Sequence, residues 1–332
     1  MTATADTAVT ADTATDDAAD SAAATVADSA AGPSTELTAD GAAQSVRPRT
    51  AASASRRGPS RRTTRKVLRA LVFRLAALAF FLLVWAAVTG AGLIDPLFLP
   101  SPRAVWDAFV RANSWHQVAP GVPREVLGEQ NYFLWEHLLA SCQRLGAGVG
   151  AAVVVGPLIG FAMGMFAPVR TALEPYLNFL RALPPLGYIG LLIVWFGIGD
   201  SSKIWLLFLA AFPPIAIATL GGVTSIKADQ INAARALGAN RVQVLVNVVL
   251  PSTLPEVING IRIATGFAWT TVVAAELNNG IPGIGGLAYL AGTQLNTPLT
   301  IACIIVIGVA ALVLDSTIKA LGAIVTPWKG KA

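Results

Sequence analysis

Residues 231–277, INAARALGANRVQVLVNVVLPSTLPEVINGIRIATGFAWTTVVAAEL, decide the fold of this chain. The first half contains two short amphipathic runs. Residues 232–237 favour a helix that Gly238 ends, and residues 242–249 favour a second helix that Pro251 stops. The pattern predicts two short helices that meet at a glycine and form a small projecting knob. Nothing in the knob is suited to act as a nucleophile or a base.

The second half of this stretch is apolar and long enough to cross a membrane. A spanning helix needs roughly 20 apolar residues to cross about 30 Å of hydrocarbon. The composition agrees, because 54% of the 332 residues are hydrophobic and only 13% are charged. We expect an all-α fold, a polytopic bundle of about six transmembrane helices. The segments that meet the rule are 71–93, 138–166, 172–198, 204–223, 255–277 and 299–324.

Two of the six segments contain polar residues that need an explanation. Segment 172–198 contains Pro184 and Pro185, which lack backbone donors, so we expect a short amphipathic piece followed by a break. In segment 299–324, Asp315 and Lys319 are four residues apart with the acid first, and we expect them to pair.

The distribution of charge predicts domains and orientation. Residues 1–65 are rich in Ala, Thr, Ser and Asp and cannot bury enough apolar surface to offset the entropy of ordering, so we expect a disordered tail. The transmembrane domain should cover 66–328, with a cytoplasmic loop at 226–252 and a short tail at 329–332. Basic residues precede the first segment and recur in the loop and the tail, whereas 278–298 has none. The positive-inside rule therefore places both termini in the cytoplasm. Because the basic run adjoins an apolar stretch, a role in membrane orientation explains it better than binding to nucleic acid does.

The knob resembles the EAA loop of binding-protein-dependent ABC-importer permeases. That loop has the form Glu-Ala-Ala, a glycine four residues after the second alanine, and a β-branched residue before Leu-Pro. Asn232 stands where the family has its acid, so an amide hydrogen bond would replace any ion pair made there. The resemblance extends over residues 138–328, including SCQRLGAG, RALPPLGYIGLLIVWFGIGDSSKI and TPWKG, and is closest to taurine permeases in the nitrate, sulfonate and taurine branch. The coupling-loop residues are then Asn232, Ala233, Ala234, Arg235, Gly238, Val248, Leu250 and Pro251.

The resemblance implies a type I ABC-importer permease (MetI-like) fold in the cytoplasmic membrane. Two permease subunits, expected to be identical, would enclose a central path. An ATPase dimer would dock on the knobs, and an extracytoplasmic solute-binding protein would deliver the solute. The implied solute is small and anionic or zwitterionic: taurine or another alkanesulfonate, with nitrate or a small organic precursor as alternatives. No GxxxxGK followed by Ser or Thr occurs, so ATP hydrolysis must come from another chain. We expect no enzyme activity and no cofactor.

The translocation path is predicted from polar residues in the fifth segment. Trp269, Thr270, Thr271 and Glu276 are polar or amphipathic in an otherwise apolar helix, and they are the candidates for that path. The alternative is that Trp269 is an interfacial ring and that both threonines bond to their own helix.

Other polar residues of the apolar segments are open to more than one reading. Arg144 could reach lipid headgroups or point inward to attract an anion, and Arg262 could pair with backbone carbonyls or with cytoplasmic acids. The glycines of 280–286 are expected to form a tight outer turn. The two histidines and two cysteines are assigned no metal, disulfide or other role. The sequence thus disfavours an intramembrane enzyme. A secondary transporter or channel remains the main alternative, although no inverted repeat or mid-membrane coupling acid is evident.

Overall fold

The computed structural model describes residues 61–117 and 123–328, and these are helical apart from loops and one short strand pair. β1 and β2 form an antiparallel hairpin. In chain order the elements are α1 (Arg61–Gly90), α2 (Pro102–Ala112), β1 (Trp115–Gln117), β2 (Glu125–Leu127), α3 (Leu134–Met165), α4 (Ala167–Ala182), η1 (Pro185–Tyr188), α5 (Ile189–Phe196), α6 (Asp200–Thr224), α7 (Ala228–Ala236), α8 (Arg241–Val244), η2 (Leu245–Val249), α9 (Leu250–Ala275), α10 (Ile284–Thr293) and α11 (Thr297–Val325).

The helices confirm the expected membrane bundle. Among the described residues, 5 helices are long and apolar enough to cross a membrane, or 6 if the bent pair α4 and η1–α5 counts as one span. The predicted tail 1–65 lies mostly outside the described residues, as does 329–332. Residues 61–65 belong to α1.

The break predicted in the third segment is confirmed. The pair of helices 167–182 and 185–196 is bent by 97°. Leu183 and Pro184 at the bend have extended backbone, because a residue that precedes proline is pushed out of the α region. The segment therefore consists of an amphipathic helix, a turn and a short apolar helix.

Close helix contacts show that this bent segment makes a return crossing. A Cβ placed on Gly148 would lie 2.6 Å from Leu207, and one placed on Gly164 would lie 2.6 Å from Val223. Positions further along α3 thus meet positions further along α6, so the two helices run in the same direction. Since α3 and α6 are parallel, the chain between them must travel back across the bilayer.

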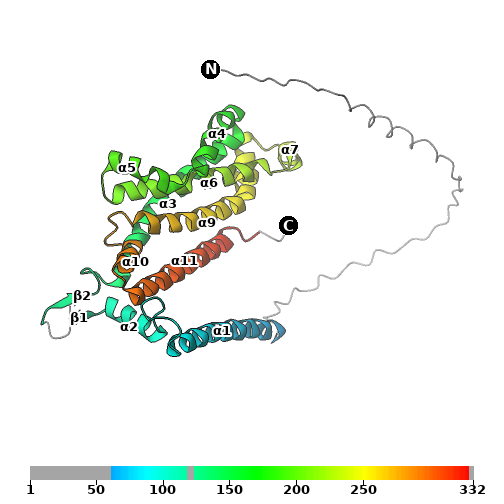
Figure 1. Cartoon of the computed structure of the whole chain (residues 1–332). Coiled ribbons are helices and arrows are strands. Elements are labelled where there is room, and N and C mark those ends of the chain that lie inside the picture. The colour runs from blue at the N-terminus through cyan, green and yellow to red at the C-terminus, as the bar shows by residue number, and fades with distance from the viewer. Residues whose placement is uncertain (1–60, 118–122, 329–332) are drawn as a thin grey trace, which may run out of the picture. The chain divides into compact units, whose positions relative to one another are not determined.

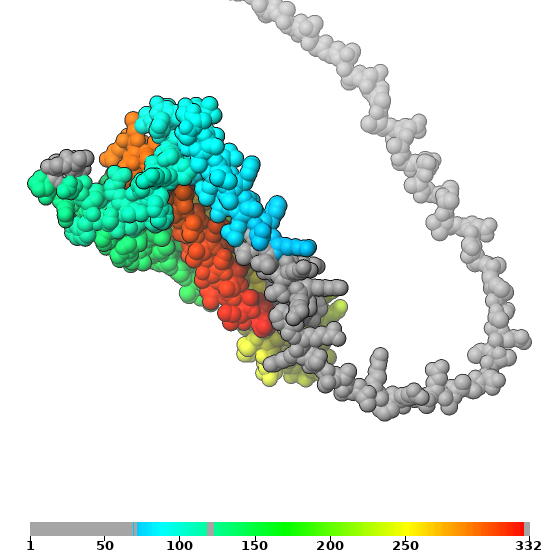
Figure 2. All heavy atoms as spheres, turned by 90° about the horizontal axis from the view of Figure 1, so that it is seen from below, coloured from blue at the N-terminus to red at the C-terminus, as the bar shows by residue number. Residues whose placement is uncertain are grey.

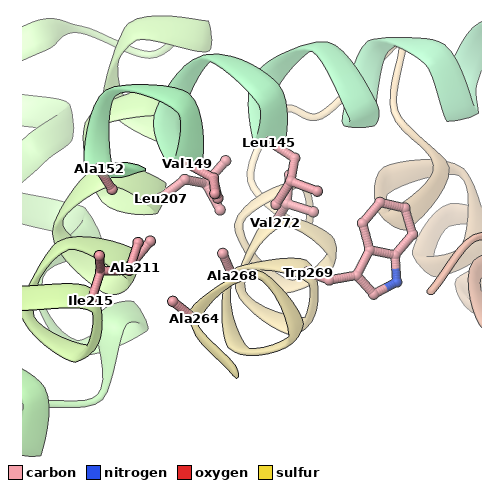
Figure 3. Close-up of a cluster of buried hydrophobic side chains, with 10 residues drawn as sticks. All are labelled: Leu145, Val149, Ala152, Leu207, Ala211, Ile215, Ala264, Ala268, Trp269 and Val272. Carbon is pink, nitrogen blue, oxygen red and sulfur yellow. The ribbon is translucent and has the colours of Figure 1, made fainter. Parts of the chain in front are cut away.

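The core lies between α3, α6 and α9, which extend side by side in Figure 1. All three helices contribute to one cluster of buried apolar side chains, which includes several alanines (Figure 3). The cluster consists of Leu145, Val149, Ala152, Leu207, Ala211, Ile215, Ala264, Ala268, Trp269 and Val272. Helix α7 of the knob lies at one end of these helices, and α10 and the β-hairpin lie at the other end (Figure 1).

One local prediction was wrong. Pro251 does not stop the second short helix, because α8, η2 and α9 continue as one helical rod, Arg241–Ala275. Pro251 lies in the first turn of α9, directly after the π-helical turn η2. The wider π turn accommodates the missing proline donor without ending the helix.

Helix α1 makes few contacts with the rest of the bundle. None of its 18-residue apolar window is buried, and the Trp85 indole nitrogen donates to the Pro100 carbonyl oxygen at 3.0 Å. Figure 2 shows α11, in orange to red, along the face next to α1, in blue. An almost wholly apolar cavity of ≈ 720 Å³ lies between α1, α2, α3 and α11.

Candidate functional site

The knob is a tightly bonded pair of helices at one end of the bundle. α7 ends in a Schellman motif, in which the Gly238 N–H donates to the Arg235 carbonyl at 2.9 Å and the Ala239 N–H to the Ala234 carbonyl at 3.1 Å. Gly238 has a φ of 86°, a left-handed conformation that glycine adopts without steric cost, so it ends α7 as the sequence predicts. Asn240 then caps α8 through reciprocal bonds with Gln243 of 2.8 and 2.9 Å. The knob therefore has a defined shape.

The tip of the knob is apolar and exposed. Leu237 is 90% exposed and Val242 is 68% exposed. Asn232 and Arg235 also lie on the surface of α7. The remaining predicted coupling residues, Val248, Leu250 and Pro251, do not lie at the tip but in the rod that follows. An exposed leucine on a rigid turn is suited to insertion into a groove of another protein.

The opposite end of the bundle holds a buried ionic network around Glu276. Glu276 is 1% exposed, and its two carboxylate oxygens share the proton of the Ser141 hydroxyl, at 2.7 and 2.9 Å. It also accepts from Arg144 Nη1 at 2.6 Å and from the Gly285 N–H at 2.8 Å. Burial of a charge is costly unless the charge is paired, and here the pairing is complete.

Arg144 connects this carboxylate to two further segments. Its Nε donates to Asp200 at 2.7 Å, and its Nη2 donates to the Pro282 carbonyl at 2.7 Å. Nearby, Lys203 Nζ donates to the Asn279 carbonyl at 2.7 Å. Arg144 therefore points inward, but it pairs with groups of the protein and leaves no free charge for a solute. The network ties the start of α6 and the loop 277–283 to α3.

Sequence reasoning gave His137 no role, yet it is fully buried beside this network. Its Nδ1 accepts from the Gly283 N–H at 3.1 Å, so Nε2 carries the proton and donates to the Glu129 carbonyl at 3.1 Å. The Glu129 carboxyl itself lies outside the spans. Burial raises its pKa, against the lowering influence of the His116 and Arg111 charges. His137 and Ser141 are four residues apart on one face of α3, and that spacing is a signal the sequence did contain.

The four candidate path residues occupy different surroundings. Trp269, Thr271 and Glu276 are buried inside the subunit, at 4%, 5% and 1% exposure. Thr270 lies on the exposed face of α9, and both threonine hydroxyls donate to the Phe267 carbonyl, at 2.8 and 2.9 Å. The Trp269 indole nitrogen is buried with no hydrogen-bond partner among the described residues.

Helix α9 presents a mixed stripe of side chains on its exposed face. Residues spaced by three or four positions share this face: Ser252, Glu256, Asn259, Ile263, Phe267 and Thr270. Polar groups within a span avoid lipid and face protein or water. This side of α9 is therefore unsuited to face lipid along its whole length.

A second ion cluster joins α9 to α11. Arg262 pairs with Asp315, which also accepts from Lys319 Nζ at 3.0 Å. The predicted Asp315–Lys319 pair is thus confirmed, and Arg262 has an acidic partner on α11. Among the described residues, no group of three His, Cys, Asp or Glu side chains is placed to hold a metal ion. Cys142 and Cys303 are free thiols.

Comparison with known proteins gives a consistent result. A family model described as binding-protein-dependent transport system inner membrane component matches residues 152–329. The taurine transport system permease protein TauC of Escherichia coli (strain K12) is 40% identical over 266 residues, which cover 79% of this chain and 92% of TauC. The nitrate import permease protein NrtB of Synechococcus elongatus is 32% identical over 258 residues, 76% of this chain and 89% of NrtB. The bicarbonate transport system permease protein CmpB of the same species is 31% identical, over 76% of this chain and 88% of CmpB.

A solved structure agrees on the fold. A chain of the inward-facing MetNI methionine ABC transporter superposes with a TM-score of 0.51 at 20% identity. The match covers 60% of this chain and 100% of that chain. The shared part is the helical bundle expected from the sequence.

Proposed function

This chain belongs to the family of binding-protein-dependent transport system inner membrane components, the permease subunits of ABC importers, and we propose that it carries taurine or another small alkanesulfonate. The similarity to TauC supports this solute. Its relatives in the nitrate and bicarbonate systems handle solutes that are also small oxyanions, so a different small anion or zwitterion is the second candidate.

The proposed assembly contains two copies of this chain, two ATPase subunits and an extracytoplasmic binding protein. The exposed stripe on α9 supports pairing of two copies, because Glu256 and Asn259 need a protein or aqueous neighbour within the membrane. The exposed tip at Leu237 supports docking of an ATPase at the knob. In this assembly both termini and the knob face the cytoplasm, and lipid surrounds the outer faces.

The observation that carries the mechanism is the continuity of the rod Arg241–Ala275. The knob is bonded to the start of this rod through the cap of α8, and α9 ends at the buried Glu276 network. Movement of the knob therefore displaces a whole membrane-crossing helix. We propose that closure of the two ATPases on ATP draws the knobs together and turns the central cavity outward, and that hydrolysis resets it inward.

Within this mechanism the four candidate path residues take two roles. Thr270 is on the exposed stripe and is proposed to meet the solute. Trp269, Thr271 and Glu276 lie behind it and are proposed to hold the wall of the path in place. The Trp269 indole N–H is the one buried side-chain polar group of this set that has no hydrogen-bond partner among the described residues.

The test is ATP-dependent taurine uptake into proteoliposomes that contain the permease, its ATPase and its binding protein. Gly238→Val should reduce uptake roughly tenfold, because a β-branched residue in the left-handed conformation is strained and distorts the knob. Gly238→Asn is the matched control, since asparagine tolerates this conformation, and it should stay near wild type. Uptake by the permease alone, without ATPase or nucleotide, would instead identify a secondary transporter or channel.

A further inference from the structure

A pocket of ≈ 370 Å³ lies beside the break between α4 and η1. Its walls come from the end of α4, from η1 and from the facing parts of α6 and α9. Most of the lining is apolar, with two side chains able to donate hydrogen bonds to a ligand. The residues that matter here are Arg181, Tyr188, Pro214, Ile263 and Phe267.

The pocket lies at the middle of the membrane-crossing helices. Pro214 is near the centre of α6, which covers Asp200–Thr224, and Ile263 is near the centre of α9, which covers Leu250–Ala275. Ile263 and Phe267 also belong to the exposed stripe of α9, so the pocket opens onto the face assigned to the partner and the path. Arg181 at this mouth is exposed in the single subunit.

Within the described part of the chain, Arg181 lacks the acidic partner that five other basic residues of the helices have. Arg144, Lys203, Arg262 and Lys319 each lie within 4.0 Å of a carboxylate, and so does Arg170 on α4 itself. No carboxylate of the described residues lies within that distance of Arg181. A cation at mid-membrane depth is costly and needs an anion or water. The broken helix adds backbone groups that are tolerated at this depth only where they line protein or a cavity.

We propose that this pocket is a transient binding site for the oxyanion group of the transported solute, with Arg181 as its anchor. The guanidinium fork matches sulfonate or carboxylate oxygens, and the Tyr188 hydroxyl is a second donor in the same lining. The apolar walls suit a short alkyl chain. This inference rests on the proposed transport function. It names the chemical class that the proposed solutes share, a small oxyanion with a single negative charge.

The first experiment measures the anion preference of the pocket without any transported solute. Ile263→Cys, in a permease with Cys142 and Cys303 replaced by alanine and assembled with its ATPase, is labelled by two methanethiosulfonate reagents. One carries a sulfonate and the other a trimethylammonium group. Arg181→Ala should lower the ratio of anionic to cationic labelling rates roughly tenfold, because a unit positive charge that lines the same pocket is removed. Arg181→Lys should preserve most of the ratio, and Arg170→Ala, on the same helix, should leave it unchanged.

The second experiment measures uptake of taurine, nitrate and bicarbonate separately by the complete importer. Whichever of these anions the importer carries, its uptake should fall roughly tenfold in Arg181→Ala. ATP hydrolysis stimulated by the loaded binding protein should persist. Arg181→Lys should be intermediate, since an ammonium lacks the fork. Arg170→Ala should transport normally.

An unchanged labelling ratio, or normal uptake by Arg181→Ala, overturns the inference. If Arg181 instead reaches a lipid headgroup, the labelling ratio stays unchanged and Arg181→Ala takes up solute normally. If wild type carries none of the three anions, the proposed solute class fails, and the labelling ratio alone still decides whether Arg181 selects anions.

Discussion

At the scale of single residues, the carboxylate of Glu276 is buried among donors of the protein and closed to a solute. Its Oε1 accepts from Arg144, its Oε2 accepts from Gly285, and the Ser141 hydroxyl shares its single proton between the two oxygens. This carboxylate is also the most buried acidic partner of Arg144. Glu276 therefore belongs to the framework at the end of the bundle opposite the knob, and we propose that this framework supports the path.

Replacement of Glu276 tests this role. Glu276→Gln places an amide N–H₂ against groups that are all donors and leaves Arg144 without its buried partner. We expect the free energy of unfolding to fall by about 3–5 kcal/mol, measured by denaturation in mixed micelles. Glu174→Gln is the control, because it breaks the exposed Arg170–Glu174 pair, whose contribution is about 0.5 kcal/mol or less. Unchanged stability combined with lost transport would show that Glu276 instead acts on the solute.

The knob and the network differ in how far the sequence reveals them. The glycine that ends α7 and the residues around it act locally, so their pattern predicts the turn at Gly238. The partners of Glu276 are distant in sequence, with Ser141 separated by 135 positions and Arg144 by 132. Only the packing of α3 against α9 brings them together. A single sequence therefore identifies Glu276 as unusual and cannot state what it binds.

At the scale of elements, α3 and α6 approach closely through small residues. In a bilayer, helices do not associate by excluding water, so close packing supplies much of the attraction. A Cβ on Gly160 would lie 2.5 Å from the Ala216 carbonyl oxygen, whereas one on Gly150 of the same helix would meet nothing within 4 Å. The two glycines thus provide a matched pair for testing this interface.

We expect Gly160→Ala to destabilise the subunit by about 1–3 kcal/mol, because the added methyl forces α3 and α6 apart. Gly150→Ala should be neutral or slightly stabilising, since alanine is the better helix former by about 1 kcal/mol. Denaturation in mixed micelles measures both variants. Equal effects of the two substitutions would mean that the α3–α6 contact does not limit stability.

The elements themselves follow from the sequence to differing degrees. Apolar length locates the middle of every span, and the proline pair correctly predicts the break in 172–198. The end of the second short helix was misjudged, because the π turn Leu245–Val249 lets the rod continue through Pro251. The strands of Trp115–Gln117 and Glu125–Leu127 were not anticipated, since three residues are too few to show a periodic pattern.

At the scale of the whole molecule, the parallel course of α3 and α6 constrains the topology. The segment between them must return across the membrane, so the bent pair α4–α5 counts as the third of six crossings. The knob at Leu237 and the turn at Leu295 then lie on opposite sides of the bilayer, because one crossing, α9, separates them. We propose that the knob faces the cytoplasm, because basic residues surround it.

This topology has a direct test in intact cells. Leu237 and Leu295 are 90% and 65% exposed, so cysteines at either position should be open to a membrane-impermeant thiol reagent. In a permease with Cys142 and Cys303 replaced by alanine, we expect labelling of Leu295→Cys from outside and none of Leu237→Cys. Inside-out vesicles should reverse the result, which controls for the reactivity of each thiol. Labelling of both positions from the same side would contradict a crossing by α9, and with it the rod through which the knob is proposed to move the path.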